Sequence, residues 1–333
     1  MIISRTPFRV SLFGGGTDYP KWYENHGGAV FGFTINKYCY ISVRPLPPFF
    51  EHRHRIVYSV VENVREIDEI QHPAVRGVLS DRNVDTGLEI HHDGDLPARS
   101  GLGSSSSFTV GLINALEAMD GSMIGKKQLA REAIRVEHHV IDEHVGIQDQ
   151  IWAAFGGVNR IEIQPDGDFD VQPAILNPQR QKELGDHLML FFTGFSRIAS
   201  TMAKKQIDNI DNRGAELTTM ASYVDQAIDI LQSDRSICEI GSLLHDNWML
   251  KRQLAGGVST PEIDAMYETA RNAGAIGGKL LGAGGGGFMV LFVEPDKQPA
   301  VEQRLSEYVR VRFDFDVTGS KIVVYEPAGL ESR

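Results

Sequence analysis

Apolar residues either alternate with polar ones or recur at helical spacing along the N-terminal half of this chain. Aromatic and β-branched residues in short alternation predict strands, at 5–13, 29–46 and 55–64. Apolar positions repeated every three or four residues predict helices, at 67–79, 104–119 and 126–144. The segment 145–163 predicts a loop, a short helix and a strand.

The pattern starts again after the turn-rich segment 164–181. The elements predicted beyond it are a strand at 187–195, helices to about 257 and over 261–272, a strand at 288–295, a helix from about 297 and a strand at 321–327. Strands precede and separate helices without a regular βαβ alternation, so we expect an α+β fold rather than a doubly wound sheet. The restart favours two domains, residues 1–178 and 179–333.

Composition narrows the function classes. The formal net charge of −11 argues against a nucleic-acid partner, because a phosphate backbone demands a basic surface. The cysteines, Cys39 and Cys238, are isolated, so we expect neither a disulfide framework nor a thiolate metal site. The first residues lack the pattern of a signal peptide, and the apolar runs are too short to span a bilayer. We therefore expect a cytoplasmic protein without a membrane partner.

Three glycine-rich segments compete as phosphate sites: 14–16, 101–107 and 282–287. The third matches G-x-G-x-x-G, but the apolar strand 288–295 follows it, whereas a dinucleotide site needs a helix there. We therefore reject a nicotinamide site. No Walker A motif is present either, because Leu280 stands where a magnesium-binding hydroxyl is needed.

The second segment has the context that a phosphate site requires. Its glycines permit close backbone approach, and the predicted helix 104–119 presents free N–H groups and the positive end of its dipole. The alternative from the residues alone is a serine N-cap behind a glycine loop, which has no function in catalysis. The residues of this candidate phosphate loop are Gly101, Leu102, Gly103, Ser104, Ser105, Ser106 and Ser107.

Three motifs in order resemble those of the GHMP small-molecule kinases, a superfamily that includes galactokinase and mevalonate kinase. They are PFRVSLFGGGTD, PARSGLGSSSS and KLLGAGGGGFMVLF, which together extend from near the start of the chain to residue 292. Further segments resemble the branch of heptose 7-phosphate kinases, which phosphorylate the anomeric hydroxyl on the way to nucleotide-activated heptoses. These are YSVVENVREIDEIQHPAVRGVL, VGIQDQIWAAFGGVN, FTGFSRIAS and GKLLGAGGGGF.

The resemblance implies a fold and a reaction. The N-terminal domain is expected to be like domain 2 of ribosomal protein S5, and the C-terminal domain to be ferredoxin-like. ATP is expected to lie with its triphosphate over residues 101–107 and to donate its γ-phosphoryl group to the anomeric (C1) hydroxyl of a heptose 7-phosphate. A galactokinase-like or fucokinase-like sugar 1-kinase, and a sensor that binds ATP and sugar without catalysis, are the alternatives. The oligomeric state stays open.

Two residues match the catalytic positions of the family. Asp149, in GIQDQ, matches the aspartate that contacts the acceptor hydroxyl, although without the resemblance a helix cap would be preferred. Arg9 matches the basic residue of the first motif, where a cation would keep that aspartate ionised. An arginine in an ordinary ion pair is the alternative for Arg9.

The resemblance also implies a magnesium site. Glu137 matches the glutamate that helps to hold Mg²⁺, and Ser105 is the serine that we favour as second ligand, since magnesium needs only one or two protein oxygens. The same predicted helix contains His138, His139 and His144. Their spacing lacks the H-E-x-x-H order, so we expect no zinc site.

The first motif is also expected to bind the sugar, through Gly15, Gly16, Thr17 and Asp18. Galactokinases carry Glu-His where this chain has Gly15 and Gly16, which argues against galactose and leaves room for a larger acceptor. A distal phosphate on the acceptor needs cations, preferably a guanidinium. Arg197 is favoured over the other candidates, which are Lys204 and the cluster 53–55.

Overall fold

The computed structural model describes residues 1–194 and 199–327, and its larger sheet organises the N-terminal part. Within the described residues, nine strands form this sheet; β13, β1, β2, β5, β3 and β4 follow one another, while β6 and β12 pair with β2, and β7 with β6. The strands are β1 (Ile2–Phe13), β2 (Gly28–Pro45), β3 (His54–Val57), β4 (Val61–Val64), β5 (Leu88–Gly94), β6 (Val158–Ile163), β7 (Phe169–Pro173), β12 (Phe315–Asp316) and β13 (Lys321–Tyr325).

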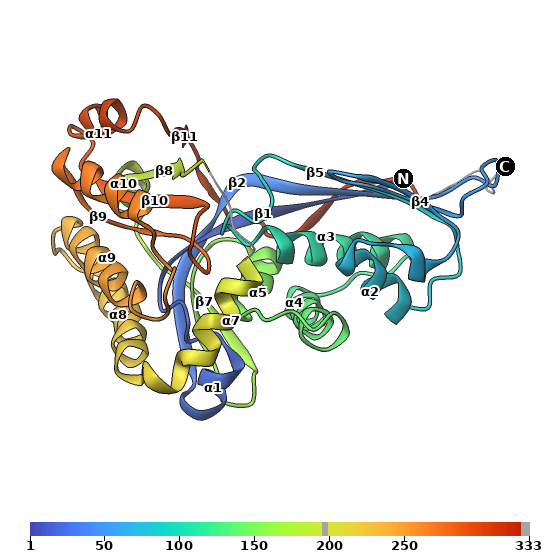
Figure 1. Ribbon diagram of the computed structural model, residues 1–333, viewed down its shortest axis with the longest axis horizontal. Helices are drawn as coiled ribbons and strands as arrows, with labels where there is room; N and C mark the ends of the chain where they lie inside the picture. Colours follow the sequence, from blue (N-terminus) through green and yellow to red (C-terminus); the bar gives the residue numbers. More distant parts are fainter. Residues whose placement is uncertain (195–198, 328–333) are drawn as a thin grey trace.

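The antiparallel strands β1 and β2 are the longest strands of the larger sheet and pair with each other. Its apolar residues alternate toward the core, and Val10 and Phe33, which face each other in the register, are both fully buried. A helical layer covers one face of the sheet (Figure 1). The helices of this part of the chain are α1 (Pro20–His26), the 3₁₀ turn η1 (Ile67–Glu69), α2 (Pro73–Asp81), α3 (Ser104–Met119), α4 (Lys126–Arg135), the π turn η2 (Val136–Val140) and α5 (Gln148–Phe155).

A second sheet of four strands organises most of the C-terminal part, and Figure 1 shows it at the opposite end of the molecule from the two termini. Its strand order is β11-β8-β10-β9, which in chain order is 4-1-3-2. This is the order of a ferredoxin-like βαββαβ sheet, here with several helices inserted between the first two strands. The strands are β8 (Leu188–Phe192), β9 (Ala275–Leu280), β10 (Phe288–Val293) and β11 (Val309–Val311).

The remaining helices belong to this C-terminal part. They are α6 (Pro178–Asp186), α7 (Ala199–Asn209), the 3₁₀ turn η3 (Ile210–Asn212), α8 (Gly214–Gln232), α9 (Cys238–Lys251), α10 (Pro261–Asn272) and α11 (Gln298–Arg304). The expected α+β class with a ferredoxin-like C-terminal sheet is confirmed. No helix in the ranges 1–194 and 199–327 combines the length and the apolarity that a membrane crossing requires.

The last strands return to the first sheet. β13 pairs with β1, and β12 pairs with β2, so residues 315–325 lie in the sheet of the N-terminal part although the expected C-terminal domain, 179–333, contains them. The buried hydroxyl of Ser320 contacts that of Thr6 at 2.8 Å, which ties the returning segment to β1. The proposed division at residue 178 therefore does not separate the two sheets.

The helix predicted over 126–144 is interrupted. The α-helical part ends at Arg135, and residues 136–140 form a π turn. Asp142 then adopts a left-handed conformation with φ of 53°, which ends the helical course before residue 144. π turns insert an extra residue into a helix and are frequent at functional sites. The turn contains Glu137, which is fully buried.

Candidate active site

A cleft lies where the two parts of the chain meet, between the start of α3, the end of β1, the start of α5 and the hairpin of β9 and β10. The residues that line it are Arg9, Ser11, Gly15, Gly16, Asp18, Tyr19, Arg99, Gly101, Gly103, Ser104, Ser105, Ser106, Glu143, Val145, Gly146, Gln148, Asp149, Ala203, Gln206, Lys251, Lys279, Gly282 and Ala283. Most of the predicted site residues are therefore on one concave surface.

The phosphate loop enters α3 without a side-chain cap. Gly103 is the cap residue and has φ of 74°, and no side chain of the described residues caps the helix. The serine N-cap considered above is therefore wrong, because Gly103 occupies the cap position. In the part of the chain that the structure describes, the N–H groups of the first turn have no partner, so they can meet a ligand at the positive end of the helix dipole. Gly101 and Gly103 both adopt left-handed conformations, which favour glycine.

Glycines of the segment 282–287 pack closely against the phosphate loop. A Cβ on Gly282 would lie 2.5 Å from the Cα of Gly101, and one on Gly287 would lie 2.2 Å from the carbonyl oxygen of Ser100. The N–H of Phe288 also donates to Ser100 O at 3.1 Å. The run lies in the hairpin between β9 and β10 rather than at a helix N-terminus, which confirms that it is not a dinucleotide motif.

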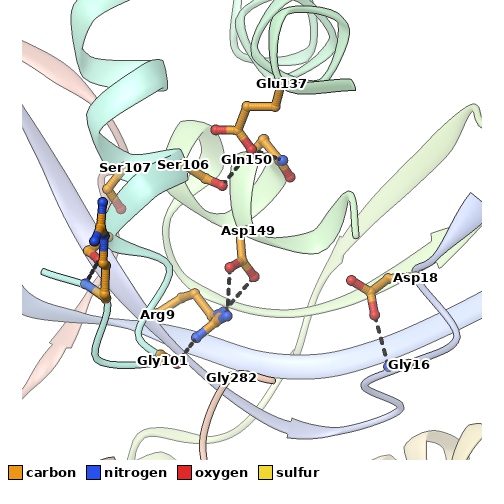
Figure 2. A network of polar contacts seen from close by, with 12 residues as sticks. Arg9, Gly16, Asp18, Gly101, Ser106, Ser107, Glu137, Asp149, Gln150 and Gly282 are labelled. Atoms are coloured by element: carbon orange, nitrogen blue, oxygen red, sulfur yellow. Dashed lines mark hydrogen bonds and ion pairs between the residues drawn. The ribbon is translucent and has the colours of Figure 1, made fainter. Parts of the chain in front are cut away.

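Arg9 and Asp149 form a two-pronged ion pair at the centre of the cleft (Figure 2). Arg9 Nε donates to Asp149 Oδ1 at 2.7 Å, and Arg9 Nη2 donates to Oδ2 at 2.6 Å. The remaining prong, Nη1, donates to the carbonyl oxygen of Gly101 at 2.5 Å. The fork geometry of arginine therefore links the aspartate to the phosphate loop. The side chain of Asp149 remains 24% exposed and so is accessible from the cleft.

The first motif contributes a buried carboxylate. Asp18 lies in the cleft, and its Oδ1 accepts from the N–H of Gly16 at 2.9 Å (Figure 2). Burial raises the pKa of Asp18 above its ordinary value. Gly15 and Gly16 line the cleft as expected, but Thr17 does not. The Thr17 hydroxyl is buried and donates to Gly14 O at 2.8 Å, so this residue stabilises the turn and is not available to a sugar.

Glu137 meets the phosphate loop through Ser106. Its Oε2 accepts from the Ser106 hydroxyl at 2.9 Å and from the side-chain amide of Gln150 (Figure 2). Its Oε1 is buried, and no hydrogen-bond partner for it exists in the part of the chain that the structure describes. Burial, with a smaller effect of the charge on Glu143, raises the pKa of Glu137 to about 8. The hydrogen bonds that this carboxyl accepts within the described residues come from neutral groups.

The serine beside Glu137 is Ser106, whereas we had favoured Ser105. Successive residues of an α-helix point about 100° apart, so only one serine of the first turn can face a given neighbour. Ser106 is buried against Glu137, while Ser105 is exposed and lines the open part of the cleft. The serine hydroxyl that contacts Glu137 is therefore that of Ser106, and the assignment of Ser105 as a magnesium ligand stays a prediction.

Two lysines of the cleft, Lys251 and Lys279, are not among the residues predicted from the sequence. Lys279 belongs to the third glycine-rich motif, and this position in the sequence could have indicated that it lies near the phosphate loop. Lys251 ends α9, in a stretch that has the composition of an ordinary charged helix, and no local signal marks it. Both are buried, which lowers the pKa of each, that of Lys251 to about 7.

Of the cations predicted for a distal phosphate, those that the structure describes lie outside the cleft. Arg197 is outside the described residues. Lys204 and the cluster 53–55 do not line the cleft, and His54 is buried, where its Nδ1 accepts from the N–H of Leu88 at 3.3 Å. Arg99 does line the cleft, in a left-handed conformation with φ of 59°.

The sequence matches known proteins over most of its length. It is 28% identical over 313 residues to the D-glycero-alpha-D-manno-heptose 7-phosphate kinase of Campylobacter jejuni, an alignment that covers 89% of this chain and 91% of that protein. It is 30% identical over 245 residues to the mevalonate kinase of Methanothermobacter thermautotrophicus, covering 70% of this chain and 76% of that protein.

The fold is also known. A D-glycero-D-manno-heptose 1-phosphate kinase from Bacteroides thetaiotaomicron superimposes with a TM-score of 0.79 at 22% identity, over 98% of this chain and 100% of that one. Residues 56–157 match the model of the GHMP kinases N-terminal domain, and residues 225–311 match that of the GHMP kinases C-terminal domain. With the loop at 101–107, the Arg9–Asp149 pair and the glycine hairpin in one cleft, the chain belongs to the GHMP kinases.

Proposed function

We propose that this protein transfers the γ-phosphoryl group of ATP to the anomeric (C1) hydroxyl of D-glycero-α-D-manno-heptose 7-phosphate, and so supplies the synthesis of nucleotide-activated heptoses. The observation that carries the proposal is the Arg9–Asp149 pair, which is bonded directly to the phosphate loop. The choice of acceptor follows the Campylobacter jejuni heptose 7-phosphate kinase, which is similar over nearly the whole chain.

The phosphate loop binds the triphosphate of ATP in this proposal. The free N–H groups at the start of α3 meet the phosphate oxygens, and Gly101 and Gly103 let the nucleotide approach the backbone. Support from Gly282 and Gly287 keeps the loop rigid. Positioning of this kind and charge stabilisation account for most of catalysis in phosphoryl transfer.

Asp149 orients the acceptor hydroxyl and takes its proton as the new O–P bond forms. The guanidinium of Arg9 fixes the carboxylate and its charge, since both carboxylate oxygens accept from that one group. The guanidinium of Arg9 also contacts the phosphate loop at Gly101. Its positive charge there stabilises the negative charge that develops on the phosphoryl group during transfer.

Glu137 and Ser106 fit a magnesium ion. One Glu137 oxygen is buried and unpaired in the described part of the chain, and the Ser106 hydroxyl touches the other. Carboxylate and hydroxyl oxygens are suitable ligands for Mg²⁺, which keeps its remaining positions for phosphates and water. Glu137 and Ser106 would hold the ion, which would supply positive charge to neutralise the β- and γ-phosphates.

The acceptor lies against Gly15, Gly16 and Asp18. Asp18 offers a carboxylate to sugar hydroxyls, and the two glycines leave space that larger side chains would fill. Arg197 remains our candidate for the distal phosphate. ATP and sugar phosphates are metabolites of the cytoplasm, where we propose that the protein works.

A panel of acceptors tests this function. Heptose 7-phosphate, galactose and fucose are each supplied with ATP and Mg²⁺, and ³¹P NMR identifies which oxygen carries the new phosphate. We expect turnover of the heptose phosphate at its C1 hydroxyl. Turnover of galactose or fucose without that of heptose 7-phosphate would favour the sugar 1-kinase alternative, and no turnover of any acceptor would favour the sensor.

A further inference from the structure

Two lysines in the cleft have no role in the function proposed so far. Lys251 is 6% exposed at the end of α9, and Lys279 is 2% exposed on β9. Both line the cleft together with Arg9, Asp18 and Asp149. Lysine is almost never fully buried unless a partner compensates its charge.

The partners of these lysines are backbone carbonyls. Lys251 Nζ donates to Leu280 O at 2.7 Å and to Gly282 O at 2.5 Å, and Lys279 Nζ donates to Leu12 O at 2.8 Å. No carboxylate of residues 1–194 or 199–327 forms an ion pair with either lysine. An ammonium group has three donors, so Lys251 keeps one that the described chain does not use.

The charges around the cleft do not balance. The cations that line it are Arg9, Arg99, Lys251 and Lys279, and the carboxylates are Asp18, Glu143 and Asp149, of which Asp18 and Asp149 act on Lys251. When all seven are ionised, one positive charge is in excess. Burial lowers the pKa of Lys251 to about 7, because the nearby carboxylates do not fully compensate the charge of the buried ammonium group. An anionic ligand in the cleft would supply the missing charge.

The position of Lys251 indicates which part of a ligand it meets. One of the two carbonyls that it contacts belongs to Gly282, whose backbone packs on Gly101. Arg9 contacts the carbonyl of Gly101 itself. Lys251 and Arg9 therefore approach the same point of the phosphate loop from α9 and from β1, beside Asp149 (Figure 2 shows the Arg9 side, with Gly101 and Gly282).

We propose that Lys251 is a catalytic residue that donates its free N–H to the γ-phosphoryl group of ATP. This inference rests on the proposed function. During transfer, the bond between the γ-phosphorus and the oxygen that bridges it to ADP breaks, and its electron pair leaves with ADP. The acceptor oxygen forms the new bond to phosphorus, and its proton passes to Asp149. Lys251 gives up no proton and acts through its charge and its hydrogen bond.

Binding of two nucleotides tests the inference without any sugar. Calorimetry measures Mg²⁺-ADP and the Mg²⁺ complex of the non-hydrolysable β,γ-imido analogue of ATP on the full chain. Lys251→Met removes the charge and keeps the length of the side chain. Its matched control is Arg252→Met, which removes the neighbouring cation; Arg252 lies outside the cleft lining and donates to Asp264 at 2.9 Å.

We expect Lys251→Met to weaken binding of the imido analogue about 10-fold or more and that of ADP less than about 2-fold, as befits one charged hydrogen bond to the terminal phosphate. Turnover should fall about 100-fold. Arg252→Met should change neither affinity. Thermal unfolding shows that each variant is folded, and Lys251→Gln replaces Lys251→Met where the latter does not fold.

Two results would overturn the inference, and only the second would also overturn the proposed function. If wild type binds the imido analogue, and the lysine variant loses affinity for both nucleotides equally or for neither, then Lys251 does not meet the γ-phosphoryl group, and the proposed function stands. If wild type binds no imido analogue, the use of ATP and the role of Lys251 fail together.

Discussion

The orientation of the Asp149 carboxylate depends on one neighbour, Arg9. Both of its carboxylate oxygens accept from Arg9, and that arginine is itself buried and bonded to the phosphate loop. An ion pair of this kind is costly to break from one side, because the remaining charge is left without a partner. The same pair that orients the aspartate thus makes it sensitive to a change as small as one atom.

Replacing Asp149 by Asn should abolish most of the activity while the protein stays folded. The amide keeps the shape of the side chain but cannot take the acceptor proton or hold a full charge beside Arg9, so we expect kcat to fall about 10³-fold or more. A steady-state assay coupled to ADP release measures the loss. Asp170→Asn, an exposed position on β7, is the control. Unchanged turnover in Asp149→Asn would refute the assigned role.

Glu137 should make stability depend on pH and on magnesium. Its pKa in the folded state, about 8, lies above the ordinary value of 4.5, so the folded state binds the proton more tightly than the unfolded chain. The stability linked to the neutral carboxyl is fully present below about pH 4.5 and is lost as the pH rises to about 8. Mg²⁺ should restore it by stabilising the ionised form.

Melting curves with EDTA and with Mg²⁺ test this linkage. Across the range from about pH 5 to pH 8 without the metal, the wild type should lose stability relative to Glu137→Gln, whose amide does not titrate. Mg²⁺ should raise the melting temperature of the wild type more at the upper end of the range, and that of the variant little. A stabilisation by Mg²⁺ that is equal in both proteins would place the metal elsewhere.

Residues that belong to motifs could be predicted, and isolated ones could not. Arg9, Glu137 and Asp149 follow from their place in recognisable segments. The choice of Ser106 over Ser105 depends on how α3 is rotated toward Glu137, which sequence spacing leaves open. Lys251 has no local signal at all, because only the packing of α9 against Gly282 brings it to the cleft.

At the scale of elements, the phosphate loop and the β9–β10 hairpin form one unit. Gly101 has φ of 83° and approaches the backbone of Leu281 and Gly282 so closely that neither side has room for a Cβ. A loop held in this way would present its N–H groups to the proposed nucleotide without rearrangement. The glycines therefore serve rigidity and close approach, and flexibility is not their function.

Gly282→Ala should weaken nucleotide binding. The new Cβ would lie 2.5 Å from the Cα of Gly101, so the phosphate loop must move, and the left-handed backbone at φ of 65° adds strain of about 1 kcal/mol. We expect the Kd for ATP to rise about 10-fold or more, since displacement of the loop disturbs several hydrogen bonds.

Gly121→Ala is the matched control for this change. Gly121 has φ of 76°, and nothing lies within 4 Å of its Cβ position, so alanine there brings the same backbone strain without a clash. Gly282→Ala should lose more stability than Gly121→Ala in thermal unfolding, because its clash adds to the shared strain, and only Gly282→Ala should lose affinity for ATP in calorimetry. Equal ATP affinity in the two variants would show that the contact with Gly101 does not position the loop.

The helix that contains Glu137 shows a limit of periodicity. Apolar spacing predicts a helix through 126–144, yet residues 136–140 form a π turn. The extra residue of a π turn interrupts the regular hydrogen bonding of the helix, so other contacts must stabilise the turn. Here Ser106 and Gln150, from α3 and α5, hold the Glu137 carboxylate. Such a turn is decided by tertiary partners that a periodic pattern does not contain.

At the scale of the whole molecule, the returning strands connect the end of the chain to the catalytic part. Ser320 N donates to Ala153 O at 2.8 Å on α5, the helix that carries Asp149, and Asn114 on α3 donates to the Ser320 hydroxyl at 3.0 Å. β13 completes the edge of the sheet next to β1. The C-terminal residues thus brace both helices that form the cleft.

A chain that ends at residue 313 should be much less stable. It lacks β12 and β13 and leaves buried hydroxyl and backbone groups without partners, each worth about 1 kcal/mol or more, so we expect a loss of about 3 kcal/mol or more. Denaturant unfolding measures it. Val323→Ser, at an exposed position of β13, should change stability by about 0.5 kcal/mol at most. Wild-type stability in the shortened chain would contradict the bracing role.

The sequence alone determined the class of fold and the order of the motifs, because helical and strand periods and glycine turns act over a few neighbouring residues. The family followed from the resemblance of the three motifs to those of the GHMP kinases. The tertiary structure alone decided which distant residues meet. It joins Arg9 to Asp149, brings Lys251 to the phosphate loop and returns residues 315–325 to the first sheet. These contacts arise from the packing of whole elements and from the pairing of buried charges, and neither is written in any local stretch of the chain.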